Sequence, residues 1–320
     1  MAVLGVQVNE VGETAWSLAA TMGAHLAGVS LTLLAAGLAL HALKLGARAR
    51  AWQNVLRASL PESRVRFRDA AVPYLAGIGV GAVVPLCGGE VMRVALARTR
   101  LRGGDENEGG GRTATIVGSL AVERALDVAV AVVVIAFALT AGLLPNGALH
   151  GRLTDVVTAM AQPIVLGVAA GAILAAAAAA WRFRYRLAAV GAGLLQGLRI
   201  LRQPRRYAVS VASWQLLSWA LRFGALVLLL EAFHVRSALL IAPVVLSLQI
   251  LASSVPVTPA GAGTQQALVA ATFGSAAMVS FSAGAQAATL LVDMLLGLAA
   301  LASCGIPLRL RAFRAAAAPT

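Results

Sequence analysis

The stretch Val84–Arg93, VPLCGGEVMR, places a proline, two glycines and two opposite charges inside an apolar segment. Backbone groups freed by such a break need partners, so broken helices at membrane depth occur only where protein or a water-filled cavity surrounds them. A second stretch of this kind, SVPVTPAGAGTQQ, follows at Ser254–Gln266. Paired segments interrupted by proline and glycine, one in each half of a chain, are typical of a transporter binding site. The two breaks therefore predict a substrate site between the halves of a membrane protein.

The composition also indicates a polytopic membrane protein. Of the 320 residues, 59% are hydrophobic and only 12% are charged, whereas globular chains carry roughly a quarter of charged residues. The length allows about six to eight apolar segments of ~20 residues. We expect a single membrane domain over residues 1–320, without a soluble catalytic domain. The acidic Met1–Ala15 lacks the basic start of a cleaved signal peptide, so we expect the first span to be retained.

The charge of the chain follows its apolar pattern. The net charge is +13, and Lys44 is the only lysine. Because the arginines fall between apolar segments, they indicate the positive-inside rule and not nucleic-acid binding. Lys44–Arg68 and Arg182–Arg206 each carry seven basic residues and predict two helices that lie in the cytoplasmic interface. The two cysteines, Cys87 and Cys304, indicate no disulfide framework and no metal site, and we expect no cofactor.

The number of membrane crossings between the two basic stretches then predicts the course of the first broken segment. Three apolar regions separate the two basic stretches: the broken one, Thr113–Leu144 and Val156–Trp181. If both basic stretches are cytoplasmic, two regions cross and one must return. The ten-residue helix after the break spans ~15 Å, about half of the ~30 Å hydrocarbon core, so the broken region is expected to be a re-entrant hairpin. The same count in the second half predicts a hairpin from the opposite face, although Ala238–Val255 is long enough to cross alone.

The predicted fold is therefore an all-α polytopic membrane protein with about five full spans and two broken or re-entrant helical hairpins. The hairpins form an inverted repeat, with residues 1–181 as the first half, broken at 85–90, and residues 182–320 as the second half, broken at 256–264. We expect the N-terminus outside the cell membrane and the C-terminus in the cytoplasm.

Ionisable residues within the spans are the candidate functional residues. A charge at membrane depth costs free energy, so its presence there indicates a functional role. Each helix that follows a break starts with free N–H groups and a positive dipole end, which together favour an anion. Glu123 and Asp127 share a helical face, whereas Arg124 is turned about 100° away. Asp293 adds an anion in the last span, and His41 is expected to be a packing residue. The candidate substrate-binding residues are Gly88, Gly89, Glu90, Arg93, Glu123, Arg124, Asp127, Arg222, Thr258, Gly261, Gly263 and Gln266.

The alternative is that these charges pair with one another and only fix helix packing. No Ser-His-Asp order, HExxH, Walker loop or CxxC occurs, so no catalytic residue is predicted.

Three motifs in their order resemble the transmembrane domain of the lysylphosphatidylglycerol synthase family, the flippase-like membrane proteins. They are Pro85 with Gly89-Glu90-x-x-Arg93, Glu123-Arg124-x-x-Asp127, and Thr258-Pro259-x-Gly261-x-Gly263. The resemblance implies a lipid-handling domain, which some members fuse to a soluble domain that transfers an aminoacyl group to phosphatidylglycerol. Ala260 and Gln266 stand where the family tends to have glycine and an acid. The missing acid favours an anionic phospholipid or a polyprenyl phosphate over a lysylated lipid.

The leading hypothesis is a lipid translocase that moves a phosphate-bearing lipid, such as an aminoacyl-phosphatidylglycerol, an anionic phospholipid or a polyprenyl-phosphate-linked lipid, across the cytoplasmic membrane. Arg93, Arg124 and Arg222 would bind phosphate, while the nearby acids would orient them or carry a proton. The alternatives are a membrane-embedded lipid or glycolipid transferase, an accessory subunit of a lipid-modifying enzyme, and a scaffold. Expected partners are a membrane lipid, a lipid-modifying synthase and a second copy of the chain.

Overall fold

The computed structural model describes residues 28–84, 88–101, 109–140, 191, 193–253 and 261–304. Within these ranges the chain is helical and contains no strand, which confirms the all-α prediction. The helices are α2 (Leu31–Ser59), α3 (Phe67–Val83), α4 (Gly88–Arg100), α5 (Gly109–Thr140), η2 (Arg199–Arg202), α9 (Pro204–Tyr207), η3 (Ala208–Ala212), α10 (Ser213–Ala232), α11 (Ala238–Ser253), α12 (Thr264–Phe273) and α13 (Ala276–Ala302). The expected span Val156–Trp181, the candidate Thr258 and the basic C-terminal tail lie outside the described residues.

Three of the described helical segments are long and apolar enough to cross a bilayer. They are α2, the continuous run Pro204–Ala232 that ends with α10, and α13. Helix α5 is longer still, with 32 residues, but its middle carries Glu123, Arg124 and Asp127. The fold is thus that of a polytopic helical membrane protein.

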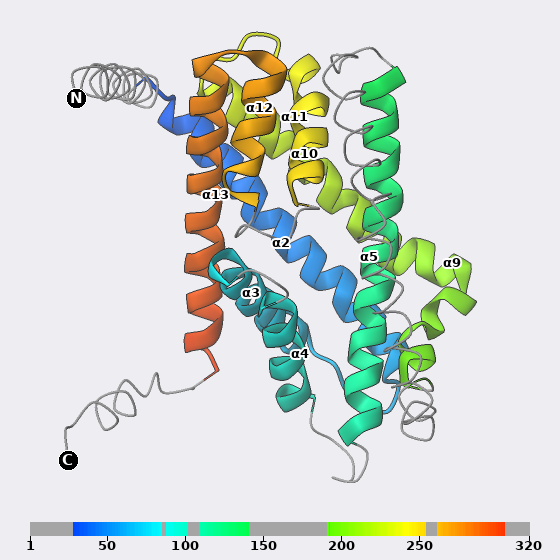
Figure 1. The fold of residues 1–320 in the computed structure, drawn as a ribbon. Coiled ribbons are helices and arrows are strands. Elements are labelled where there is room, and N and C mark those ends of the chain that lie inside the picture. The colour runs from blue at the N-terminus through cyan, green and yellow to red at the C-terminus, as the bar shows by residue number, and fades with distance from the viewer. Residues whose placement is uncertain are drawn as a thin grey trace, which may run out of the picture.

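Helices α3 and α4 form the first hairpin (Figure 1). They approach so closely that a Cβ atom on Gly77 would lie 2.7 Å from the carbonyl oxygen of Gly89. The start of α3 at Ala70 and the chain beyond α4 at Leu101 share one buried cluster with Leu60, so the hairpin leaves the bundle at the end where it entered. Helix α4 has 13 residues and a length of about 20 Å, which is shorter than the hydrocarbon core.

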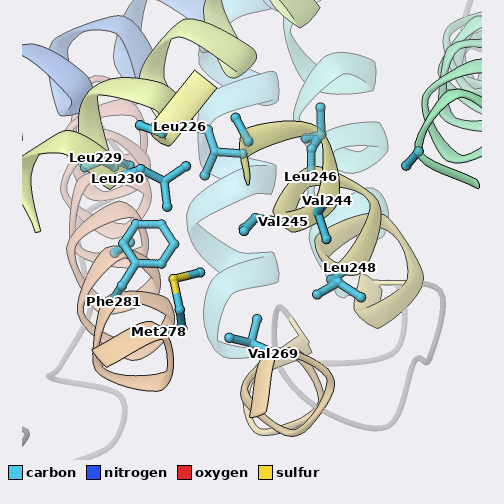
Figure 2. Close-up of a cluster of buried hydrophobic side chains, with 14 of the residues drawn as sticks. Leu226, Leu229, Leu230, Val244, Val245, Leu246, Leu248, Val269, Met278 and Phe281 are labelled. Carbon is cyan, nitrogen blue, oxygen red and sulfur yellow. The ribbon is translucent and has the colours of Figure 1, made fainter. Parts of the chain in front are cut away.

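Helices α11 and α12 form the second hairpin. Helix α12 has ten residues and covers only about 15 Å. Figure 2 shows the apolar cluster that holds this hairpin, in which Val244 and Leu248 of α11 and Val269 of α12 meet side chains of α10 and α13. One of these, Phe281 of α13, also contacts the ring of Phe233 edge to face, with 5.4 Å between centroids. Helix α12 is too short to span the membrane, and burial of these side chains stabilises its position in the bundle.

The two hairpins pack against opposite halves of α13 (Figure 1). At the start of α12, Gln265 donates a hydrogen bond to Ser282, in the first half of α13. In the second half, a Cβ atom on Gly79 of α3 would lie 2.7 Å from Cα of Gly297. The open end of the first hairpin lies near Cys304, whereas the open end of the second runs directly into the start of α13. The open ends of the two hairpins therefore lie at opposite ends of α13, as the inverted arrangement predicted.

The first basic stretch differs from its prediction as an interfacial helix. Residues 44–59 continue α2 without a break, and their apolar face packs on protein. Trp52 and Leu56 are fully buried in the cluster formed with α3, α4 and α5. A one-sided apolar face fits a protein surface as well as a lipid surface, because burial is not directional. The described part of the second basic stretch forms η2 and α9 and leads through η3 into α10.

Candidate functional site

A polar cavity of about 380 Å³ lies between the two hairpins. Its wall takes residues from α2, α3, α10, α11, α12 and α13. The polar members are His41, Lys44, Arg222, Gln249, Ser253, Gln265, Gln286, Thr289 and Asp293. Polar and charged groups inside a bundle of apolar helices mark a functional site. Of the predicted substrate-binding residues, Arg222 lines this cavity.

One wall of the cavity is a hydrogen-bonded chain of three ionisable side chains. His41 Nε2 lies 2.9 Å from Asp293 Oδ1 and joins α2 to α13. Lys44 Nζ lies 3.3 Å from His41 Nδ1. Since an ammonium group only donates, His41 accepts at Nδ1 and donates from Nε2. The structure thus replaces the expected packing role of His41 with a place in the cavity wall.

The facing wall carries the second cation. Arg222 of α10 donates a hydrogen bond of 3.3 Å to Gln249 of α11. Its guanidinium carbon lies 5.1 Å from the ring centroid of Trp219, within reach of a cation–π contact. An arginine held in this way presents a planar set of donors that suits phosphate.

The start of α12 closes the cavity on the side of the second break. Gly261 and Gly263 have φ angles of +73° and +84°, a conformation that glycine adopts without steric cost. Gln266 accepts the N–H of Gly263 at 2.8 Å and donates to Gln286 at 2.6 Å. The side chain of Gln266 therefore caps a helix end that the sequence predicted to bind an anion. A glutamate at this position would keep the cap but lose the donor to Gln286.

A second cluster of charges joins the first hairpin to α5. Arg93 and Glu123 form a buried ion pair of 2.5 Å. Arg48 of α2 binds Asp127 and lies 3.4 Å from Glu123. A further pair joins Glu90 to Arg124. Within the described residues this network pairs three arginines with three carboxylates.

Arg93 is the most enclosed member of the network. It is only 6% exposed, and its guanidinium carbon lies 3.9 Å from the Trp52 ring centroid and 4.5 Å from that of Tyr74. The predicted contact with Glu90 is longer, at 3.9 Å. Arg93 thus binds carboxylate and two aromatic rings together, which fixes α4 against α2 and α5.

The structure brings most of the predicted residues into these two places. Glu90, Arg93, Glu123, Arg124 and Asp127 form the network, Gly88 and Gly89 begin α4, and Arg222, Gly261, Gly263 and Gln266 lie in or beside the cavity. Trp219 connects the two places, because its indole N–H bonds Asp127 at 3.1 Å while its ring faces Arg222.

Sequence reasoning missed His41, Lys44 and Arg48 as a group. Their spacing of three and then four residues places them on one helical face, and this was the available signal. The signal was obscured because Lys44 and Arg48 also begin a basic stretch that fits an interfacial helix.

Helices of spanning length, two opposed hairpins and a charged interior cavity define a polytopic membrane protein. The family model of the lysylphosphatidylglycerol synthase transmembrane region matches residues 6–309, nearly the whole chain. The chain belongs to this family, and the resemblance seen in its three motifs is confirmed. No curated protein matches the chain, and no solved structure does. Membership indicates a function related to membrane lipids.

Proposed function

We propose that this protein is a lipid translocase that binds the headgroup of a phosphate-bearing lipid in the cavity and moves it across the cytoplasmic membrane. The observation that carries the proposal is the pair of cations, Lys44 and Arg222, in a cavity between two opposed hairpins. Family membership supports a lipid as the substrate.

The size and lining of the cavity favour a headgroup as its occupant. A volume of about 380 Å³ is at the lower end of the ~300–1,000 Å³ that ligand pockets usually have. It suits a phosphate with its attached alcohol, while the lipid tails remain in the bilayer. Arg222 would bind the phosphate, and the amides of Gln249 and Gln265 would bind hydroxyl groups.

The charge network would support this site without contacting the headgroup. The guanidinium groups of Arg93 and Arg124 are already engaged with carboxylates, so their proposed role is to position α4, and that of Glu90, Glu123 and Asp127 is to orient the arginines. Gly88 and Gly89 would allow α4 to start close to α3. Thr258, Gly261 and Gly263 would shape the second break.

Movement of the headgroup requires that the cavity open to each leaflet in turn. The two hairpins lie on opposite halves of α13, so rocking of one half against the other would open the cavity alternately. We place the open end of the first hairpin at the cytoplasmic face, because Arg98 and Arg100 lie in the last turn of α4 and Arg102 follows it.

Lipid movement in proteoliposomes tests the proposal. A fluorescent phosphatidylglycerol analogue is placed in both leaflets, and its loss of protection from a membrane-impermeant quencher is followed. Arg222→Gln should slow movement at least about tenfold, because a hydrogen bond to a charged group contributes about 1.5–3 kcal/mol. Arg236→Gln, a change of an exposed arginine in the turn between α10 and α11, is the matched control. Equal rates in the two variants, or a wild-type protein that moves no lipid, would contradict the proposal.

A further inference from the structure

We propose that the His41–Asp293 pair carries a proton that couples lipid movement to the proton gradient across the membrane. This inference rests on the proposed function of the cavity and names its coupling ion.

The partner of Asp293 distinguishes it from the other carboxylates within the described helices of the bundle. Glu123 pairs with Arg93 and Arg48, and Asp127 pairs with Arg48. An arginine does not release its proton in proteins, so the partner of each of these acids keeps its charge. Asp293 instead pairs with a histidine, the side chain that changes charge between about pH 5 and 8 when its surroundings leave it unperturbed.

The geometry of His41 gives protonation a structural consequence. With Lys44 as an ammonium, which only donates, the two contacts assign His41 as the donor from Nε2 to Asp293 and the acceptor at Nδ1. Because Nε2 already carries a proton, His41 takes up a further proton at Nδ1, which then becomes a donor. The Lys44 ammonium loses its acceptor and faces a second cation, so it must turn away from His41. Lys44 lines the cavity, and the ammonium group is thereby released toward a headgroup.

The other groups around the pair determine the sign of the coupling. Lys44 of α2 and Arg222 of α10 face the pair as cations, α3 presents the apolar Ile78, and α11 and α12 present amides that do not titrate. Arg48 lies one turn beyond Lys44 and is held by Asp127. With neutral His41, the described lining holds two cations and one anion. Proton uptake adds one positive charge, so a bound proton and a bound phosphate stabilise each other.

Thermodynamic linkage makes this effect reciprocal. If a bound proton raises the affinity for the headgroup by some factor, the bound headgroup raises the affinity for the proton by the same factor. The lipid would load with a proton on the side of lower pH and be released with it on the side of higher pH. One proton and one lipid would therefore cross together.

The test is lipid movement in proteoliposomes with and without an imposed gradient of one pH unit. The wild-type rate should rise severalfold when the gradient and the lipid flux have the same direction. His41→Gln and Asp293→Asn should move lipid at a rate that does not respond to the gradient. Glutamine keeps a side-chain donor for Asp293 but cannot take up the proton. Ser280→Ala changes the same helix outside the cavity, where the hydroxyl donates to the carbonyl oxygen of Ala276, and should keep the wild-type response.

A second readout covers variants that fail to fold. A pH-sensitive dye inside vesicles that contain wild-type protein should report proton entry when an anionic lipid is added outside. Lipid movement that ignores the gradient and brings no protons would overturn this inference and leave the proposed function intact. Absence of lipid movement in the wild-type protein would reject both.

Discussion

Arg93 shows how the physical setting of one side chain decides between a structural and a binding role. Its guanidinium is buried, paired with Glu123 and placed against Trp52 and Tyr74. Removing one member of a buried ion pair leaves the other as an uncompensated charge, which costs far more than the pair itself contributes. Arg124 belongs to the same network, but 65% of its side chain is exposed, so water screens its pairing with Glu90.

Alanine substitutions at these two arginines should therefore differ strongly. Arg93→Ala should destabilise the protein by about 3–5 kcal/mol, because Glu123 remains buried. Arg124→Ala should cost about 0–1 kcal/mol, as exposed ion pairs do. Denaturant unfolding of detergent-purified protein, followed by tryptophan fluorescence, measures both. Similar losses in the two variants would contradict the assignment of Arg93 as a structural residue.

The sequence identified most of these residues but not their partners. Spacing within one helix predicts contacts three or four residues apart, and that rule found the pairing of Glu90 with Arg93. It could not place Arg48 beside Asp127, because 79 residues separate them and only the packing of α2 on α5 joins them. Nor could it show that Arg222 and Asp293 line one cavity.

At the scale of elements, glycines on two faces of α3 set the position of the first hairpin. Gly77 and Gly81 are four residues apart and face Gly89 of α4, whereas Gly79 faces Gly297 of α13. Small residues at such spacing let helix backbones approach closely in membranes, where packing drives association. Helix α3 is thus held between α4 and α13 by contacts that leave no room for a side chain at Gly77 or Gly79.

Two alanine substitutions on α3 test this packing. At Gly77 a Cβ atom would lie 2.7 Å from a carbonyl oxygen, whereas at Gly81 its nearest neighbour would be at 3.6 Å. Gly77→Ala should therefore lose about 1–3 kcal/mol through overpacking. Gly81→Ala should be neutral or gain about 0.5–1 kcal/mol from its higher helix propensity. Thermal unfolding in detergent compares them, and equal stability would show that the hairpin does not depend on this contact.

The hairpins could be predicted from the sequence because proline, glycine and charge interrupt an apolar run at membrane depth only where protein or water satisfies the freed backbone groups. The course of α2 could not be predicted in the same way. Its basic residues and apolar face fit an interfacial helix, and only the cluster around Trp52 and Leu56 shows that protein covers that face. Local pattern gives the faces of a helix but not the surface that each face meets.

At the scale of the whole molecule, the two hairpins enter from opposite ends and pack against opposite halves of α13 (Figure 1). Arg222, His41 and Asp293 come from three different helices to line one cavity. The sequence predicted the inverted arrangement from charge parity, whereas the cavity itself follows from long-range packing that no local pattern contains.

Labelling of single cysteines tests the inverted arrangement. In a background with Cys87 and Cys304 replaced by serine, Thr99→Cys marks the end of α4 and Ala276→Cys marks the start of α13; both positions are exposed. A membrane-impermeant maleimide should label Ala276→Cys on intact cells and Thr99→Cys only after permeabilisation. Full reaction of both in detergent is the control. Labelling of both from the same side would contradict opposed hairpins.

The presence of a single lysine allows the cavity to be labelled selectively. Apart from the chain's own amino terminus, Lys44 carries the only primary amine in the sequence, and it lines the cavity. Amine-selective reagents react slowly with arginine, so among the side chains of this protein they modify Lys44. A lipid carrying an aldehyde in its headgroup would condense with this amine to a Schiff base and water, and after reduction with borohydride the mass of the marked peptide would identify the bound lipid.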